Sequence, residues 1–411
     1  MRTLYNLGIH LYNLLMHIAA LFNPKAKLWV EGRKGIFDRI KNDVDPGYIV
    51  WIHAASVGEF EQARPLIERI RKEYPTKKIL LTFFSPSGYE LRKNYDLVDY
   101  VYYLPIDTKK NAKRFIDLIK PEMVFFIKYE FWFNYLNELY KRIIPMYLVS
   151  TIFRPNQYFF KWYGAWGRKH LRMIEHFFVQ DNQSATLLKW INPERISITG
   201  DTRFDRVKSL TENPKSFETI QHFVEDSKVL LAGSSWEPDE KILLNYLGNE
   251  TQIFKLIIAP HEVNKEHIDS LLNRFSNFTP LLFSKFEDKE IPKENRVLII
   301  DSVGKLMHLY QYTDVAYIGG GFGVGIHNIL EAATYKKPVI FGPKYQKFNE
   351  AKELISKQGG FSISNEKEFT TIASKLLFDS KAYEQASAEC GKYVEENIGA
   401  TEKIFLECFE I

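Results

Sequence analysis

Cysteine is scarce in this chain, which has only Cys390 and Cys408 among 411 residues. Both lie near the C-terminus without metal-ligand spacing, so neither a disulfide framework nor a zinc site is indicated. The ten histidines are scattered, and His261-Glu262 lacks a second helical ligand. No serine lies in a G-x-S-x-G turn. The sequence therefore argues against metal-assisted and serine hydrolysis, and we expect neither a metal nor a cofactor.

The chain also lacks a strong excess of charge of one sign. Its net charge is +4, and it contains no recognisable nucleic-acid-binding motif, so we expect no nucleic-acid partner. What is present is the composition of a folded protein, with 45% hydrophobic and 26% charged residues. Because a single core organises roughly 250–300 residues, a chain of this length is expected to form two domains.

The N-terminal segment from Leu4 to Phe22 contains no charged residue and is followed by a basic cluster. On a helix, its four polar residues form one stripe, and leucines and an isoleucine occupy the remaining surface; the polar residues are Asn6, His10, Asn13 and His17. This pattern favours an amphipathic helix lying on a membrane surface over a spanning helix. A helix buried against the first domain is the alternative.

Short apolar runs alternate with longer amphipathic stretches along both halves of the chain. They begin at Tyr48, Lys78, Tyr100, Met123, Pro145, Phe177 and Ile196, and again at Lys228, Lys255, Val297, Val315 and Pro338. Such runs are typical of buried parallel strands in βαβ units. A polar stretch at 208–227 is predicted to be a linker with one helix.

These patterns predict an α/β protein with two doubly wound, Rossmann-like domains that face each other across a cleft. The predicted parts are a membrane-associated segment at 1–30, a first domain at 31–207 and a second domain at 208–411. In such folds ligands bind at the carboxyl ends of the strands. The motifs described next all follow predicted strands.

The glycine-rich segment GGGFGVGIHNILEAA, from Gly319 to Ala333, has the strongest binding signal. Glycines between a strand and a helix leave backbone amides free to bind an anion. If the helix begins at about His327, then His327, Asn328 and Glu331 share one face of it. A carboxylate at that position is suited to accept the hydroxyls of a ribose. The segment therefore predicts a nucleotide site.

Three further motifs place polar groups at strand ends in the first half. In HAASVGE, Ser56, Gly58 and Glu59 are candidates for binding a phosphate or a sugar hydroxyl, although Ser56 and Glu59 also have the spacing of a helix capping box. Glu130 lies among aromatic residues in KYEFWFN, where a raised pKa or a cationic partner is expected. Arg203 in GDTRFD supplies a cation.

Taken together, the motifs resemble those of the 3-deoxy-D-manno-octulosonic acid (Kdo) transferases of lipopolysaccharide biosynthesis. The matching segments occur in the family's order and approximate spacing; they are KLWVEGRKG, HAASVGE, LPID, KYEFWFN, GDTRFD, AGSSWEPDE, DSVGKLMHLY and GGGFGVGIHNILEA. The resemblance implies a glycosyltransferase-B fold, CMP-Kdo as donor and the lipid A precursor as acceptor. It also implies inversion at the anomeric carbon, no metal requirement and a location at the cytoplasmic face of the inner membrane.

Carried over by position, the resemblance assigns Glu31 as the general base and Glu130 and Arg203 as groups that stabilise the transition state. Ser56, Gly58 and Glu59 are assigned to the acceptor. The donor-binding set comprises Gly233, Ser234, Ser235, Pro260, His261, Val303, Gly304, Lys305, Gly320, Gly321, His327, Asn328, Ile329, Leu330 and Glu331.

The sequence departs from the family pattern at several of these motifs. An arginine stands at 203 where lysine is usual, and His261 stands where arginine is frequent. Two other functions remain open: a UDP-sugar 2-epimerase of the same fold, and a catalytically inactive nucleotide-binding protein at a membrane.

Overall fold

The computed structural model describes residues 1–192, 194–287 and 289–409. It divides into two compact units, of which the first comprises Met1–Arg206 with Ile398–Ile411 and the second Val207–Asn397. The division predicted from the sequence assigned 208–411 to the second domain. The C-terminal segment instead packs on the first unit.

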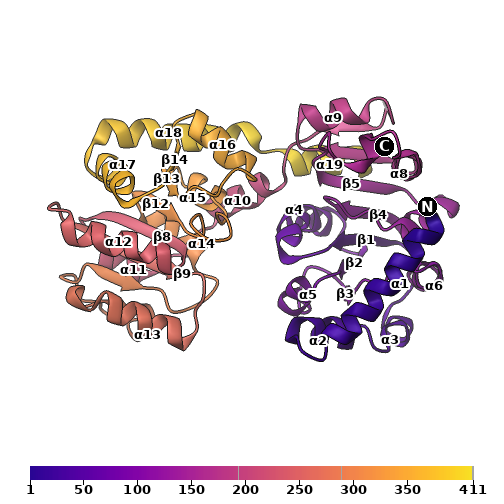
Figure 1. The fold of residues 1–411 in the computed structure, drawn as a ribbon, viewed down its shortest axis with the longest axis horizontal. Helices are drawn as coiled ribbons and strands as arrows, with labels where there is room; N and C mark the ends of the chain where they lie inside the picture. Colours follow the sequence, from indigo (N-terminus) through magenta and orange to yellow (C-terminus); the bar gives the residue numbers. More distant parts are fainter. Residues whose placement is uncertain (193, 288, 410–411) are drawn as a thin grey trace. The chain divides into compact units, whose positions relative to one another are not determined.

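The first unit is built on a seven-stranded parallel sheet of order β3-β2-β1-β4-β5-β6-β7 (Figure 1). Each strand lies where an apolar run predicts one. The strands are β1 (Ile49–Ala54), β2 (Lys78–Phe83), β3 (Tyr100–Tyr103), β4 (Pro121–Ile127), β5 (Met146–Thr151), β6 (His176–Val179) and β7 (Ile196–Ile198). Central strand β1 is completely buried, which explains why its sequence is continuously apolar rather than alternating.

Helices cover both faces of this sheet. They are α1 (Arg2–Ala19), α2 (Pro24–Glu31), α3 (Ile36–Asp43), α4 (Val57–Glu73), α5 (Pro86–Arg92), α6 (Lys109–Ile119), α7 (Phe133–Lys141), α8 (Ala165–Leu171), α9 (Asn182–Leu188) and α19 (Ala400–Phe409), with the short 3-10 helix η1 (Tyr158–Phe160). One apolar cluster joins α4 and α19 to the sheet, and the other joins α3, α6, α7 and α9. The sheet is therefore the middle of three layers.

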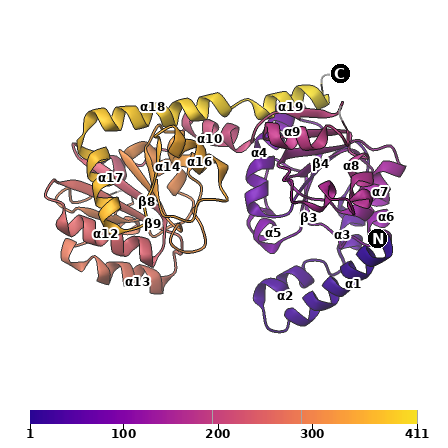
Figure 2. The same cartoon turned by 45° about the horizontal axis from the view of Figure 1, so that its top comes forward.

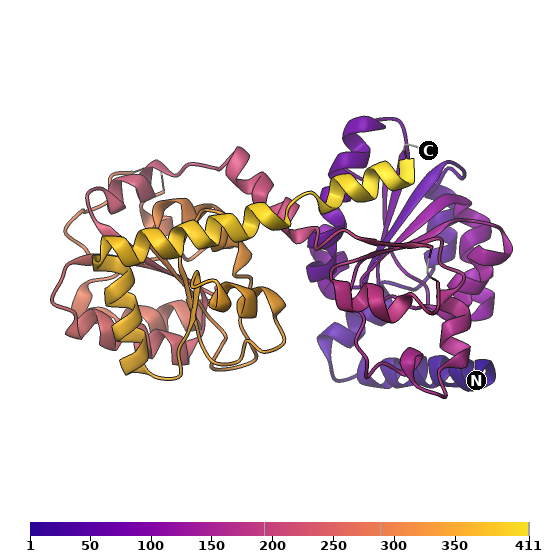
Figure 3. The same cartoon turned by 90° about the horizontal axis from the view of Figure 1, so that it is seen from above.

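Helix α19 is attached to the first unit by polar contacts as well as by its apolar face. The carboxylate of Asp205 accepts hydrogen bonds from the backbone amides of Gly399 and Thr401 at 2.6 and 2.7 Å. Arg69 of α4 forms an ion pair with Glu402 at 2.9 Å. Asp205 thus caps the helix at its N-terminus, where backbone amides need an acceptor. Figure 3 shows α19 as the yellow helix that ends at the C-terminus.

The second unit repeats the design with a parallel sheet of order β10-β11-β9-β8-β12-β13-β14. Its strands are β8 (Lys228–Ser235), β9 (Phe254–Pro260), β10 (Leu281–Leu282), β11 (Val297–Ile299), β12 (Val315–Ile318), β13 (Val339–Phe341) and β14 (Gly360–Ser362). The sequence did not predict β10 and β14. Both are edge strands of two or three residues, too short to produce an apolar run.

The helices of the second unit are α10 (Arg203–Glu212), which crosses the boundary, and α11 (Glu218–Val224), α12 (Glu237–Asn249), α13 (Lys265–Arg274), α14 (Leu306–Leu309), α15 (Leu330–Ala333), α16 (Asn349–Ser356), α17 (Glu366–Phe378) and α18 (Ser380–Asn397), with η2 (Ser276–Phe278), η3 (Phe283–Lys285) and η4 (Tyr310–Tyr312). The stretch at 208–227 therefore contains the end of α10 as well as α11, rather than one helix.

Helix α1 lies on the first unit (Figure 2), which it contacts through polar and aromatic side chains. The hydroxyl of Tyr5 donates a 2.5 Å hydrogen bond to the buried carboxylate of Asp107, and Asn6 accepts one from Asn134 at 2.9 Å. No residue of α1 is buried, however, so the alternative of a buried helix is wrong. Within the described part of the chain, no helix combines the length and apolarity needed to cross a membrane.

The leucines of α1 and Ile18 point away from the protein. The exposed set comprises Leu4, Leu7, Leu11, Leu14, Leu15 and Ile18, whose exposed fractions range from 50% to 66%, and Leu21 and Phe22 continue it beyond the helix. The half-buried residues, among them Tyr5, Asn6, Ile9 and Asn13, face the protein. This distribution is the reverse of that in an ordinary surface helix, whose apolar face is covered.

Candidate functional site

The polar groups of the first unit gather after β1 and β4, which are neighbours in the sheet. Ala55, Ser56 and Glu59 follow β1, and Glu130 follows β4. Because both strands are parallel, their carboxyl ends lie at the same edge. The sequence therefore predicts this grouping correctly for HAASVGE and KYEFWFN.

Glu59 is the group in this cluster whose ionisation is most perturbed. Its Oε2 accepts a 2.5 Å hydrogen bond from the backbone amide of Ala55. Burial, assisted by the negative charge of Glu130, raises the pKa of Glu59 to about 7. The Ala55 amide and Lys128 oppose this shift. A carboxylate with this pKa can take up a proton near neutral pH.

Ser56 stands at the N-cap of α4, but its side chain does not cap the helix. Of the two hydrogen bonds in the predicted capping box, only one resembling that of the glutamate is present: the carboxylate of Glu59 accepts from the backbone amide of Ala55, just before the helix. Within the described residues, the hydroxyl of Ser56 has no hydrogen-bond partner. Gly58 is exposed, and the nearest atom to a Cβ placed there is Ser56 Oγ at 4.0 Å. Ser56 and Gly58 thus leave room for a ligand beside Glu59.

Glu130 is positioned by two aromatic side chains. Its Oε2 accepts a 2.7 Å hydrogen bond from the indole Nε1 of Trp132 and lies 3.2 Å from Nε2 of His53. His53 is completely buried in β1, and its Nδ1 lies 2.9 Å from the hydroxyl of Thr82. His53 and Trp132 therefore hold Glu130 in one orientation. The sequence did not single out either residue.

Arg203 lies after β7, at the start of α10, and its charge is compensated. Its guanidinium pairs with Asp201 at 2.8 Å. Although burial opposes ionisation of Asp201, Arg203 keeps the pKa of that carboxyl below its usual range. Gln62, one turn after Glu59 on α4, donates a 2.8 Å hydrogen bond to Asp201. Arg203 is thus linked to the Glu59 cluster through α4.

Glu31 is not brought into this cluster. It is the last residue of α2, and its side chain is exposed. Among the described residues it has no contact with Glu130 or Arg203. The match to WVEGRKG, on which its assignment as base rests, therefore has no support from the geometry.

In the second unit, the predicted nucleotide segment begins at the end of β12 but its helix starts later than predicted. Helix α15 has only four residues and begins at Leu330, so the prediction that His327, Asn328 and Glu331 share a helix face is wrong. The backbone amide of His327 instead bonds to Gly319, which folds the loop back on the strand end. Asn328 still contacts Glu331, through a 3.0 Å hydrogen bond between their side chains.

The geometry of this loop requires glycine at several positions, as Gly320 and Gly321 illustrate. Gly320 has φ +90°, a conformation that side chains disfavour. A Cβ on Gly321 would lie 2.6 Å from the backbone of Gly342 in the neighbouring loop. The glycine-rich pattern therefore reflects close backbone packing as well as open amides.

Three aromatic rings stack above these strand ends. The ring centroids of Trp236 and His261 are 4.6 Å apart, and those of His261 and His327 are 4.4 Å apart. Trp236 Nε1 donates a 3.2 Å hydrogen bond to His327 Nε2. Burial and the adjacent His261 lower the pKa of His327 to about 4, so this ring is neutral at pH 7. The stack follows β8, β9 and β12 and offers flat surfaces and ring nitrogens to a ligand.

Asp239 connects this stack to the glycine loop, and the sequence did not reveal it. Its Oδ2 accepts hydrogen bonds from the amides of Trp236 and Gly320 at 2.9 and 3.0 Å, and its Oδ1 accepts one from Tyr317 at 2.6 Å. Its position as third residue of α12 was a capping signal that could have found it.

The remaining predicted donor residues divide into three groups. Gly233, Ser234, Pro260, Ile329 and Leu330 lie at or beside the strand ends that carry the stack. Ser235 is buried, and its hydroxyl donates to Glu240, so it is not available to a ligand. Val303 and Gly304 form an exposed turn, while Lys305 pairs with Glu287 at 2.9 Å.

Comparisons with known proteins agree with the motifs. A family model described as 3-deoxy-D-manno-octulosonic-acid transferase (kdotransferase) matches residues 29–206. A 3-deoxy-D-manno-octulosonic acid transferase of Haemophilus influenzae is 28% identical over 86% of this chain and 85% of its own length. The enzyme of the same name from Aquifex aeolicus is 28% identical over 84% of this chain and 92% of its own. The chain is similar to Kdo transferases along most of its length. The resemblance predicted from the motifs is confirmed. The homologues of this chain are named as Kdo transferases, which are glycosyltransferases.

Solved structures show the same fold at lower identity. A UDP-GlcNAc 2-epimerase from Neisseria meningitidis, bound to UDP-GlcNAc, has a TM-score of 0.61 at 15% identity over 87% of this chain and 98% of its own. MurG from Acinetobacter baumannii has a TM-score of 0.57 at 10% identity over 89% of this chain and 100% of its own. Such likeness concerns the fold alone. It agrees with the predicted glycosyltransferase-B type of two parallel-sheet α/β units.

Proposed function

We propose that this chain transfers Kdo from CMP-Kdo to the lipid A precursor, with inversion and without a metal. Relatives named as Kdo transferases along most of the chain support the reaction class. The observation that carries the mechanism is the coupled pair Glu59 and Glu130 at the ends of β1 and β4, in which Glu59 has a pKa of about 7.

Glu59 is the general base of this proposal, in place of Glu31. A sugar hydroxyl is a weak nucleophile until its proton is removed. Glu59 takes that proton while the hydroxyl oxygen forms a bond to the anomeric carbon of Kdo. The bond from that carbon to the CMP phosphate oxygen breaks on the opposite side, and CMP leaves with the electron pair. Ser56 and Gly58, which leave space beside Glu59, suit the acceptor.

Glu130 and Arg203 have supporting roles. The charge of Glu130, fixed by His53 and Trp132, keeps Glu59 basic and also favours positive charge that develops on the sugar ring. Arg203 is already paired with Asp201, so its net contribution to the departing phosphate is small. The backbone amides of the glycine loop and the Trp236–His261–His327 stack are suited to the nucleotide.

The test is an assay of CMP release from CMP-Kdo with and without the lipid A precursor. Release that requires the acceptor supports transfer. A UDP-sugar 2-epimerase, the candidate suggested by the fold neighbours, would instead act on UDP-GlcNAc without an acceptor. Binding of CMP without turnover would support the inactive nucleotide-binding protein.

We also propose that α1 contacts the cytoplasmic face of the inner membrane. Its exposed leucines and the basic residues that follow, Lys25 and Lys27, have the composition of interfacial helices. The exposed Trp162 and Tyr163 lie shortly before α8, whose Trp166 contacts Tyr5 of α1 with ring centroids 5.8 Å apart. These aromatics suit the headgroup level.

Substitution of the exposed leucines tests this contact better than deletion, because Tyr5 and Asn6 of α1 bond to the first unit. We expect Leu7→Asn with Leu11→Asn and Leu14→Asn to move the protein from pelleted vesicles to the supernatant. The stability of the fold should not fall, since these side chains are exposed. Unchanged pelleting would contradict the contact.

A further inference from the structure

The polar stripe of α1 lines a continuous furrow on the first unit. Two adjoining pockets, of about 430 and 510 Å³, share Asn13, Ile106 and Asn111. On one side, α1 contributes the stripe of Asn6, His10, Asn13 and His17. On the other lie the turn between α2 and α3 and the start of α6. We call this feature the α1 furrow. Its polar wall explains why a helix with an exposed apolar face carries a stripe of amides and imidazoles.

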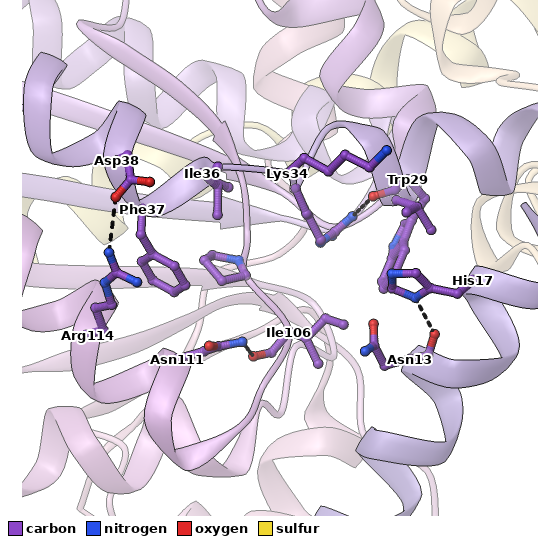
Figure 4. Close-up of a pocket in the computed structure, with 14 residues that line it drawn as sticks. Asn13, His17, Trp29, Lys34, Ile36, Phe37, Asp38, Ile106, Asn111 and Arg114 are labelled. Carbon is purple, nitrogen blue, oxygen red and sulfur yellow. Dashed lines mark hydrogen bonds and ion pairs between the residues drawn. The ribbon is translucent and has the colours of Figure 1, made fainter.

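Cations outnumber acids in the α1 furrow. Arg33, Lys34 and Arg114 line the first pocket, and Lys109 and Lys110 line the second. Asp38 is the acidic residue among the lining side chains, and it pairs with Arg114 at 3.2 Å. Figure 4 shows His17 and Asn13 on the α1 side of the first pocket, facing Asn111 and Arg114 across it. The electrostatic potential in the furrow therefore favours an anion.

Arg33 adds a fixed positive charge to the wall of the first pocket. Its guanidinium donates hydrogen bonds to the carbonyls of Leu104, Trp29 and Phe84, at 2.9, 2.9 and 2.8 Å. It also lies over the rings of Trp29, Phe84 and Tyr103. Among the described residues it has no carboxylate partner. Burial lowers the pKa of Arg33 to about 9, so the guanidinium still carries its charge at neutral pH.

The furrow also offers hydrogen-bond donors that its own residues do not use. Within the described chain, the side-chain amide of Asn13 has no hydrogen-bond partner. Helix α6 begins at the wall of the second pocket, where its N-terminal end adds positive potential. A tetrahedral anion fits this combination of amide donors and flexible ammonium groups, since it accepts hydrogen bonds in several directions.

We propose that the α1 furrow binds the phosphate group of an anionic membrane lipid. A neighbouring face of the same helix carries the exposed leucines, so a phosphate in the furrow lies beside a surface suited to its acyl chains. The choice of a lipid over free phosphate rests on the proposed membrane contact. The preference for an anion rests on the furrow alone.

Calorimetric titration of the full chain with short-chain lipids in monomeric form tests this proposal. We expect dihexanoyl phosphatidylglycerol to bind, and both inorganic phosphate and zwitterionic dihexanoyl phosphatidylcholine to bind at least about tenfold more weakly. The double variant Lys34→Gln/Arg114→Gln should lose roughly tenfold or more in affinity for phosphatidylglycerol, because it removes two charged donors. Lys34 is exposed and the side chain of Arg114 is 48% exposed, so the fold should tolerate the change.

The matched control is Lys41→Gln/Arg195→Gln, which removes the same charges from exposed positions of the first unit outside the furrow. Its affinity should equal that of the unaltered chain. If inorganic phosphate bound as tightly as the lipid, the ligand of the furrow would be a free anion and not a lipid. Absence of lipid binding, or equal losses in both double variants, would overturn the site. Since the lipids are monomeric, failure of the leucine face to hold vesicles would not change this result.

Discussion

The two units place different chemistry at equivalent ends of their sheets. In the first unit, the carboxyl ends of β1 and β4 carry the coupled carboxylates Glu59 and Glu130, one of which titrates near neutral pH. In the second, β8, β9 and β12 end in glycines and stacked rings, and His327 is neutral at pH 7. Under the proposed function, the same architecture separates proton transfer from nucleotide binding. Proton transfer in the first unit requires a side chain that changes its charge. Nucleotide binding in the second unit requires groups whose charge does not change near neutral pH.

Among variants that test this comparison between the units, we expect Glu59→Gln to have the largest effect on turnover. Loss of a general base typically lowers kcat by about 10²–10⁴-fold. The matched variant is Glu31→Gln, which removes an exposed carboxylate of the same unit and should change kcat by less than about twofold. Acceptor-dependent CMP release measures both. A large loss in Glu31→Gln with normal turnover in Glu59→Gln would restore the assignment made from the sequence.

The raised pKa of Glu59 in the first unit should also make the free energy of unfolding depend on pH. The pKa of Glu59 is about 7 in the folded protein, against an ordinary value of 4.5 for a free glutamate. Between these values the folded state binds more protons than the unfolded state, so stability falls as pH rises through this window. Glu59→Gln should therefore be more stable than the unaltered protein at pH 8, by at most about 3 kcal/mol, and about equal at pH 4.5. Urea unfolding at the two pH values measures the difference. An equal difference at both would contradict the raised pKa.

In the second unit, Gly321→Ala should destabilise the structure by about 1–3 kcal/mol, because its Cβ would lie 2.6 Å from the backbone of Gly342. Gly248→Ala in α12 is the control, since the nearest atom to its Cβ is 3.8 Å away. That change should be neutral or stabilising. Denaturant unfolding compares them, and similar midpoints for the two variants would argue against the close packing of the glycine loop.

A smaller effect is expected for Asp239→Asn. The amide cannot accept all three of the hydrogen bonds that the carboxylate receives, so Gly320 or Tyr317 loses its acceptor. We expect affinity for CMP to fall about tenfold, with kcat at saturating donor nearly unchanged. Glu237→Gln, at an exposed position of the same helix, should leave affinity unaltered. A drop in kcat alone would move Asp239 from binding to catalysis.

The elements of this fold could be predicted where one physical signal determines them. Buried parallel strands require continuous apolar runs, so the long strands of both sheets were found, whereas edge strand β10, with two residues, left no such signal. Residues that follow strands, such as Glu59 and Glu130, were found for the same reason. The position of His327 was not predicted correctly, because its backbone amide bonds to Gly319 and the helix begins only after it. His53 and Asp239 act through contacts between distant segments, which spacing along the chain does not encode.

The central claim is the separation of proton transfer from nucleotide binding, and one paired measurement tests it directly. The CMP dissociation constant and the kcat at saturating CMP-Kdo are determined for Glu59→Gln and His327→Ala. We predict that Glu59→Gln loses turnover and binds CMP within about twofold of the unaltered protein. His327→Ala, which breaks the ring stack, should bind CMP roughly tenfold more weakly and keep most of its turnover. Weak CMP binding by Glu59→Gln, or lost turnover with intact binding in His327→Ala, would contradict the account.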